Sequence, residues 1–200
     1  MKPPQNHCRG YLPHIEVKKL QFLTFRLYDS LPREVLVQAK MMVEHLQNLD
    51  SSVDKDTARQ REMMRLIDQY EDAGYGQCFL RDPQVAEVVQ DTLKVHDGIK
   101  YNLLEWCIMP NHVHVLVNVL GDYSLSQILH SWRSYSAQKA NEILGRKGQF
   151  WMHEYFDRYI RDHRHYTSVV NYIANNPVKA GLARTVDEWQ WRGSTALNAW

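Results

Sequence analysis

Residues 101–120, YNLLEWCIMPNHVHVLVNVL, decide the fold class, because two strand-like runs meet there at a tight turn. The runs are Tyr101–Met109 and His112–Leu120, and both are rich in aromatic and β-branched residues. Between them, Pro110-Asn111 is a turn-forming pair. The stretch therefore predicts an antiparallel hairpin.

Further strands and helices are predicted on both sides of the hairpin. Strand-like composition marks two more segments, Gln21–Leu27 and Phe150–Ile160. Helical spacing of apolar residues marks three segments, namely the one that follows Asp82-Pro83, Ser124–Leu144, and Asp162–Asn176, which Pro177 is expected to stop.

This order of elements predicts an α+β fold. We expect a ferredoxin-like or RRM-like antiparallel sheet with helices on one face. Residues 1–200 are expected to form a single domain, with a helical insertion at about residues 33–72. Within it, residues 47–61 are polar and charged and predict a loop that links two helical pieces.

Composition excludes several classes of protein. The chain has 200 residues and is 44% hydrophobic, which is enough for a sizeable core. No apolar run approaches the roughly 20 residues that cross a bilayer, and the first ten residues lack the apolar core of a signal peptide. We therefore expect no membrane partner and a cytoplasmic location.

Charge is unevenly distributed, although the formal net charge is only +1. Residues 131–200 contain 10 Lys and Arg against 6 Asp and Glu, whereas residues 41–100 contain 7 against 12. This asymmetry would suit a phosphate-binding surface built from the two ends of the chain, with the acidic middle facing elsewhere. Ordinary surface charge is the simpler interpretation.

The run His112-Val113-His114-Val115 carries the first candidate chemistry. Strand periodicity puts the valines on one face and both imidazoles on the other. Two neighbouring imidazoles could chelate a metal ion, which would act as a Lewis acid on a phosphoryl oxygen. An isolated H-x-H pattern arises often by chance, so two half-exposed histidines are the alternative.

Tyr172 and Asn176 form the second candidate element, because their i, i+4 spacing puts them on one helix face. A tyrosine, with a reference pKa of about 10, becomes a nucleophile only beside a cation that favours its phenolate. The Asn176 carbonyl would be a third ligand of the kind that suits Mg or Mn. The alternative is a core tyrosine and a helix-terminating asparagine.

Basic residues surround these elements, with aromatic residues among them. Cations that contact phosphates and rings that stack on bases are the means by which single strands are bound. The candidate DNA-binding residues are Arg158, Arg161, Arg164, Lys179, Arg184 and Arg192.

At these residues the chain resembles the REP-associated tyrosine transposases, which are single-tyrosine relatives in the HUH transposase superfamily. The resemblance extends from near the N-terminus to beyond the last predicted helix. It is carried by YLPH at residues 11–14, FLTFRLYDSLP at 22–32, WCIMPNHVHVLV at 106–117, EYFDRYIR at 154–161 and YIANNPVKAGL at 172–182.

The resemblance implies a role for each matching residue. His112 and His114 correspond to the paired metal histidines of the family, Tyr172 to its nucleophile and Asn176 to a further metal ligand. It implies a transposase-like endonuclease and strand transferase that needs Mg or Mn, acts on single-stranded or hairpin DNA at the nucleoid, and forms a 5′-phosphotyrosine intermediate. A monomer and a homodimer are both compatible with it.

Two other functions stay open at the level of sequence. One is a non-catalytic nucleic-acid-binding module, because ferredoxin-like sheets also bind RNA, although the usual RRM aromatic signature is absent. The other is a hydrolase that uses a metal-bound water, in which Tyr172 would be structural. Such a hydrolase should survive Tyr172→Phe.

Overall fold

The computed structural model describes residues 6–8, 13–15, 20–38, 41 and 65–195. Strands and helices within these ranges follow one another in the order β1 (Asn6–Cys8), β2 (Pro13–Ile15), β3 (Leu20–Leu27), η1 (Phe79–Arg81), α3 (Pro83–Lys94), β4 (Tyr101–Ile108), β5 (His112–Val119), α4 (Leu125–Ile143), β6 (Trp151–Tyr159), α5 (His163–Lys179), η2 (Val186–Glu188) and β7 (Arg192–Ser194).

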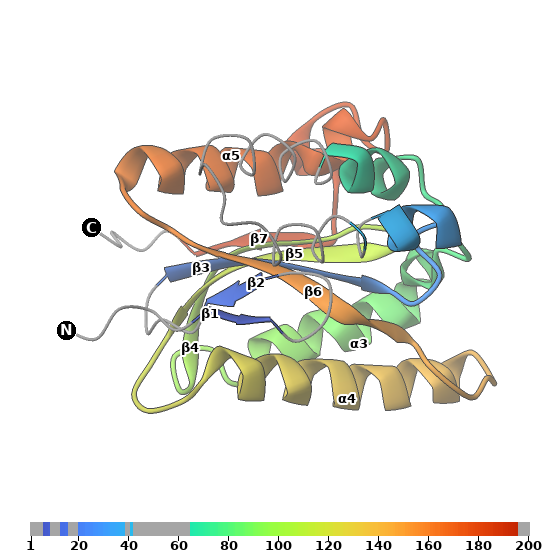
Figure 1. The fold of residues 1–200 in the computed structure, drawn as a ribbon, viewed down its shortest axis with the longest axis horizontal. Helices are drawn as coiled ribbons and strands as arrows, with labels where there is room; N and C mark the ends of the chain where they lie inside the picture. The colour runs from blue at the N-terminus through green and yellow to red at the C-terminus, as the bar shows by residue number, and fades with distance from the viewer. Residues whose placement is uncertain (1–5, 9–12, 16–19, 39–40, 42–64, 196–200) are drawn as a thin grey trace.

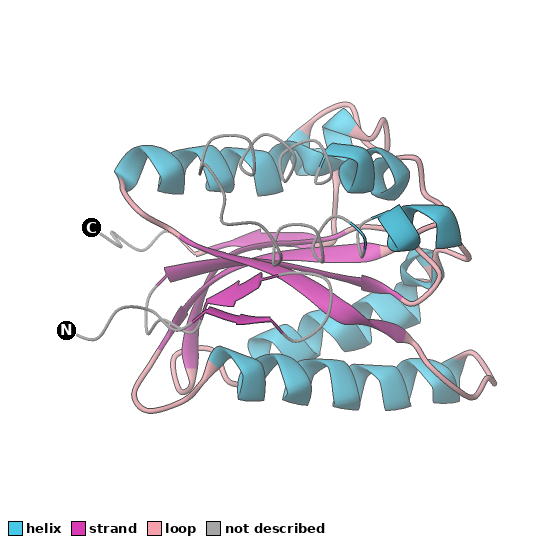
Figure 2. Ribbon diagram, viewed as in Figure 1, coloured by secondary structure: helices cyan, strands magenta, loops and turns pink. Residues whose placement is uncertain are grey.

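A five-stranded antiparallel sheet in the order β6-β3-β5-β4-β7 forms the centre of the molecule (Figure 2). The predicted hairpin is its middle, because β4 and β5 pair directly and the Met109 N–H donates to the His112 carbonyl across the turn. The path β3-α3-β4-β5-α4-β6 is the ferredoxin-like connectivity, to which β7 adds a short edge strand. The predicted α+β fold class is confirmed.

Both faces of the sheet are covered, as Figure 1 shows. Helices α3 and α4 pack on one face, where Val113, Val115 and Val117 of β5 join the larger core. Helix α5 lies over the opposite face, where Leu116 and Ile173 belong to a second core cluster. The expectation of helices on one face thus holds for α3 and α4 only, because β5 is buried on both sides and its second face requires a cover of its own.

Side-chain caps fix where the helices begin. Asp82 accepts a hydrogen bond from the Gln84 N–H at the start of α3, and Ser124 and Gln127 form a capping box at the start of α4.

In the described part of the chain, no helix is long and apolar enough to span a membrane.

Pro177 does not stop α5, contrary to the sequence-based expectation, since the helix continues to Lys179. A proline inside a helix removes one hydrogen bond, but only the last turn follows it here. Ile173, Asn176 and Pro177 are all buried against the sheet. Packing therefore outweighs the local preference of the residue before proline for extended backbone.

The expected insertion at residues 33–72 falls partly outside the described residues. Its described parts are helical at residues 33–38 and 65–72. They pack on each other through a small cluster that includes Val35, Ile67 and Met152 and is separate from both main cores. The division of the chain into a domain and an insertion stays a prediction.

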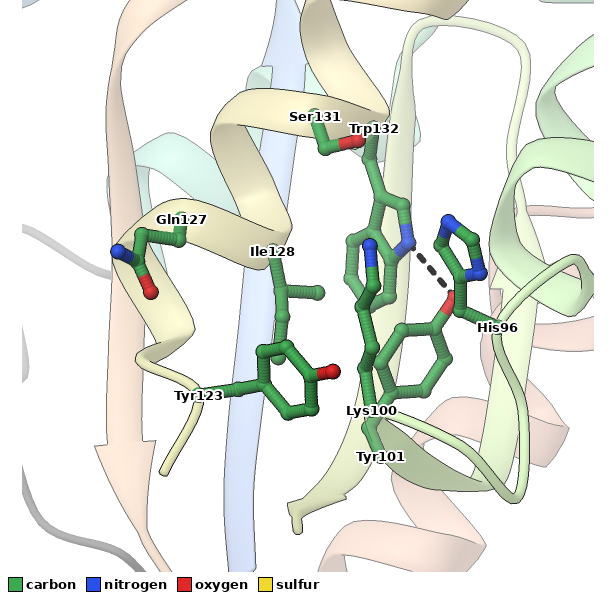
Figure 3. Close-up of a pocket in the computed structure, with 8 residues that line it drawn as sticks. All are labelled: His96, Lys100, Tyr101, Tyr123, Gln127, Ile128, Ser131 and Trp132. Atoms are coloured by element: carbon green, nitrogen blue, oxygen red, sulfur yellow. Dashed lines mark hydrogen bonds between the residues drawn. The ribbon is translucent and has the colours of Figure 1, made fainter. Parts of the chain in front are cut away.

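Tyr101 links the sheet to helices α3 and α4, and Figure 3 shows its hydrogen bond with Trp132 of α4. Its buried hydroxyl donates to the Leu93 carbonyl of α3 at 2.7 Å and accepts from Trp132 Nε1 of α4 at 2.9 Å. Tyr123 belongs to the same cavity of about 330 Å³, but its ring is 41% exposed.

Tyr101→Phe is therefore expected to destabilise the fold by about 1–3 kcal/mol, because the Trp132 N–H and the Leu93 carbonyl would lose their partner inside the core. Urea unfolding followed by Trp fluorescence measures the change. The matched control is Tyr123→Phe, which should stay within about 0.5 kcal/mol of the wild type. Equal losses in the two variants would contradict the role given to the Tyr101 hydroxyl.

Candidate metal and tyrosine site

His112 and His114 lie side by side on the face of β5 that α5 covers. Both are buried, with 1% of each residue exposed. Their Nε2 atoms are 3.0 Å apart. The period-two prediction that the two imidazoles share a face is confirmed, while the expectation of half-exposed rings in the alternative interpretation is not met.

Two neighbouring side chains orient these rings. The Asn111 amide donates to the Tyr75 carbonyl, which leaves its Oδ1 to accept from His112 Nδ1 at 2.7 Å. Thr24 on the adjacent strand β3 bonds His114 Nδ1 at 2.8 Å. The tautomer with both protons on Nδ1 would leave both Nε2 atoms with lone pairs toward the same point, as in metal sites where a second residue fixes the tautomer.

The surroundings keep both imidazoles neutral. Burial, with smaller contributions from Arg26 and Lys179, lowers the pKa of His112 to about 3. Burial and the neighbouring His112 ring lower the pKa of His114 well below its usual range. Neutral imidazole is the form that binds metal.

Asn176 brings a third polar group to this point from α5. Its Nδ2 lies 3.1 Å from His114 Nε2. The residue is 1% exposed, and its Oδ1 has no hydrogen-bond partner among the described residues. A buried amide oxygen without a partner is costly, which makes it a suitable donor for a cation.

These three residues fit a divalent metal ion. Two ligands at about 2.1 Å in adjacent octahedral positions lie about 3 Å apart, which matches the spacing of the two Nε2 atoms. Within the described ranges, no group of three or more His, Cys, Asp or Glu side chains could hold a metal. The candidate donor set is His112, His114 and Asn176, whose amide must flip to bring Oδ1 to the position where Nδ2 now lies beside His114 Nε2.

Tyr172 stands one helical turn before Asn176 and faces the same point. Its ring centroid is 5.2 Å from that of His114 and 5.9 Å from that of Phe22. Burial, followed by Asp68, Glu71 and Asp72, raises the pKa of its hydroxyl. The chain alone thus favours the neutral phenol, and ionisation needs an added positive charge nearby.

A pocket of about 250 Å³ opens beside the Tyr172 side chain. Phe22 and Thr24 of β3 form part of its wall, and Asp68 and Arg158 also line it. Aromatic, cationic and anionic groups therefore meet at the mouth of the candidate site.

Three acidic residues from the middle of the chain, Asp68, Glu71 and Asp72, lie beside the candidate site, so the sequence-based expectation that this part faces elsewhere does not hold for them. Glu71 forms a buried ion pair with Arg26, and Asp72 Oδ2 lies 2.7 Å from Lys179 Nζ. Burial and then Glu71 raise the pKa of Asp68 to about 6. Helix 65–72 folds back beside α5, a contact between distant segments that local charge counts cannot register.

The six predicted DNA-binding residues do not form one cluster. Arg158 lines the Tyr172 pocket, and Lys179 Nζ lies 5.8 Å from the Tyr172 ring centroid. Arg161 and Arg164 are exposed at the opposite end of α5, about 20 Å or more from Lys179 at 1.5 Å per residue. Arg184 is exposed beyond α5.

Arg192 is engaged within the protein. One of its guanidinium nitrogens lies 3.4 Å from Asp187, and another lies 3.9 Å from Glu105. The assignment of all six residues to DNA stays a prediction.

Sequence reasoning missed several residues of the site. Thr24 and Arg26 share the face of β3 that also carries Phe22, and they pair with His114 and His112 in the sheet register. An arginine in a strand of mostly apolar residues was an available signal. No local pattern could have indicated Glu71, whose role depends on a contact across 45 positions of the chain.

A scan of protein families matches residues 79–176 to the family described as "Transposase IS200 like". The matched segment includes His112, His114, Tyr172 and Asn176. A REP-associated tyrosine transposase from Escherichia coli (strain K12) is 29% identical over 98 residues, which are 48% of this chain and 56% of that protein. The match thus spans little more than half the length of that relative.

Two solved structures are similar. A REP-associated tyrosine transposase bound to a REP hairpin matches with a TM-score of 0.49 and 17% identity, over 94% of this chain and 81% of the other. A proposed transposase from Deinococcus radiodurans R1 matches with a TM-score of 0.38 and 13% identity, over 88% and 98% of the two chains. In sequence, this chain is thus similar to a REP-associated tyrosine transposase, and its residues 79–176 match the family described as "Transposase IS200 like".

Proposed function

We propose that this chain is a metal-dependent enzyme that cuts and joins single-stranded DNA beside a hairpin, with Tyr172 as the nucleophile. The observation that carries the proposal is the convergence of the His112, His114, Asn176 and Tyr172 side chains on one buried point. Kinship with transposases supports DNA as the substrate. The hairpin preference follows the family resemblance.

Each residue of the candidate site has its own role in the proposed reaction. His112, His114 and Asn176 would hold Mg or Mn, and the mixed nitrogen and oxygen donor set favours Mn of the two. When bound, the ion supplies positive charge that favours the phenolate and polarises the phosphate. Phe22 holds the Tyr172 ring edge-on and so limits its orientation.

In the proposed step, the Tyr172 hydroxyl loses its proton to solvent and its oxygen attacks a backbone phosphorus in line with the 3′-oxygen. The departing 3′-oxygen takes up a proton from solvent. The product is a 5′-phosphotyrosine and a strand with a free 3′-hydroxyl. Because the new ester keeps the energy of the broken phosphodiester, attack by a 3′-hydroxyl can reverse the step and join strands without a nucleotide cofactor.

Tyr172→Phe should abolish the covalent protein–DNA adduct, because the phenyl ring keeps the packing but lacks the nucleophilic oxygen. An end-labelled DNA hairpin with single-stranded flanks, incubated with Mn and run on a denaturing gel, measures adduct and cut strand together. Cutting that persists without an adduct would favour a hydrolase that uses water. If the protein is instead a non-catalytic nucleic-acid-binding module, the wild type should form neither the covalent adduct nor the cut strand.

His112→Ala and His114→Ala should each lower the cleavage rate by at least about 100-fold, since each removes a metal ligand. Hairpin affinity should change little, because Lys and Arg contacts to phosphates carry most of it. Single-turnover cleavage and fluorescence anisotropy measure the two quantities on the same preparations. A parallel loss of binding and cleavage would show that the histidines serve the fold or the DNA interface instead.

Thr24→Val should weaken Mn binding by about 10- to 100-fold, because it frees the His114 ring to rotate or change tautomer. Thr24→Ser keeps the hydroxyl and should bind Mn nearly as the wild type does. Titration calorimetry with Mn compares the three proteins directly. Similar affinities for Thr24→Val and Thr24→Ser would remove Thr24 from the site.

A further inference from the structure

Two cations beside the candidate site are held by carboxylates of one short helix. Arg26 pairs with Glu71, and Lys179 Nζ lies 2.7 Å from Asp72 Oδ2. Both cations are close enough to the imidazoles to lower the pKa of His112. The cations therefore stand where a phosphate that reaches Tyr172 would need positive charge.

The two pairs differ in how firmly they are closed. The Arg26 and Glu71 side chains are 2% and 1% exposed, and Arg26 Nη2 is buried without a hydrogen-bond partner among the described residues. The Lys179 side chain is 52% exposed and that of Asp72 is 18% exposed. A solvated ion pair is weak and is readily exchanged for another anion.

A third carboxylate adds negative charge at the same place. Asp68 lines the Tyr172 pocket. Together Asp68, Glu71 and Asp72 raise the pKa of Tyr172, so their field reaches its hydroxyl. The same field repels an incoming DNA phosphate.

The helix that carries these carboxylates is attached separately from the main cores. Helix 65–72 lies beside the C-terminal part of α5 in Figure 1. Its buried anchor, Ile67, belongs to the small third cluster and to neither core of the sheet. The buried Arg26–Glu71 pair ties this helix to β3, so the exchange is expected at the solvated Lys179–Asp72 pair alone.

We propose that Arg26 and Lys179 form a phosphate-binding subsite beside Tyr172, and that Glu71 and Asp72 occupy it until a DNA backbone phosphate replaces Asp72 at Lys179. This inference rests on the proposed function, because the phosphate is that of the DNA strand which Tyr172 would attack. It assigns the subsite a ligand class, a phosphodiester anion. It also gives helix 65–72 the role of an intramolecular competitor.

Fluorescence anisotropy with the full chain and a labelled DNA hairpin carrying single-stranded flanks tests the subsite, over a series of salt concentrations. Asp72→Asn is isosteric and frees Lys179. It should raise affinity several-fold and steepen the salt dependence by about 0.7 in slope, the value for one more phosphate contact with a single strand. The matched control is Asp91→Asn, which removes the same charge from an exposed position of α3 on the other face of the sheet.

The Lys179→Gln background separates a local effect from a general one. There, Asp72→Asn should add no more affinity than Asp91→Asn does, because the cation that Asp72 occupies is gone. Equal gains from Asp72→Asn and Asp91→Asn in the wild-type background would overturn the subsite, even if the wild type forms a Tyr172 adduct with Mn. A larger gain from Asp72→Asn without any adduct would support the subsite and count against the proposed strand transfer.

Discussion

Two imidazole rings that are buried too deeply to be protonated impose the constraint on which this site depends. His112 and His114 are neighbours because a strand alternates, and they are neutral because neither water nor a counter-charge reaches them. Their hydrogen-bond partners then determine how the two rings are oriented. Asn111 and Thr24 bond the two Nδ1 atoms, which leaves both Nε2 atoms facing inward.

The same constraint accounts for helix α5, which covers the second face of the sheet. A sheet face that carries two neutral imidazoles cannot be left to solvent, because water would restore their usual pKa values. Helix α5 covers that face, and it brings Asn176 and Tyr172 to the histidines in doing so. Apolar contacts of Leu116 and Ile173 around the polar centre hold the helix in place. Helix α5 therefore both covers this face of the sheet and carries two side chains of the candidate site.

Much of this could be predicted from sequence, because the signals are local. The alternation of histidine and valine gives the shared face, and the spacing of Tyr172 and Asn176 gives their common side of α5. The remaining features depend on tertiary contacts. Pro177 stays helical because its neighbours are buried, and the second sheet face needs α5 because β5 is buried on both sides. Neither feature can be recognised from a short stretch of the sequence.

Electrostatics is where the sequence was least informative, since a net charge of +1 averages over groups that matter only at one place. Beside Tyr172, the cations Arg26 and Lys179 are matched by Glu71 and Asp72, and Asp68 adds a further acidic group. Without a metal, this arrangement attracts a cation more than an anion. A bound divalent ion would reverse that balance and make the site attractive to phosphate. Metal and this one phosphate would therefore favour each other's binding, while Lys and Arg contacts to other phosphates carry most of the affinity for the hairpin.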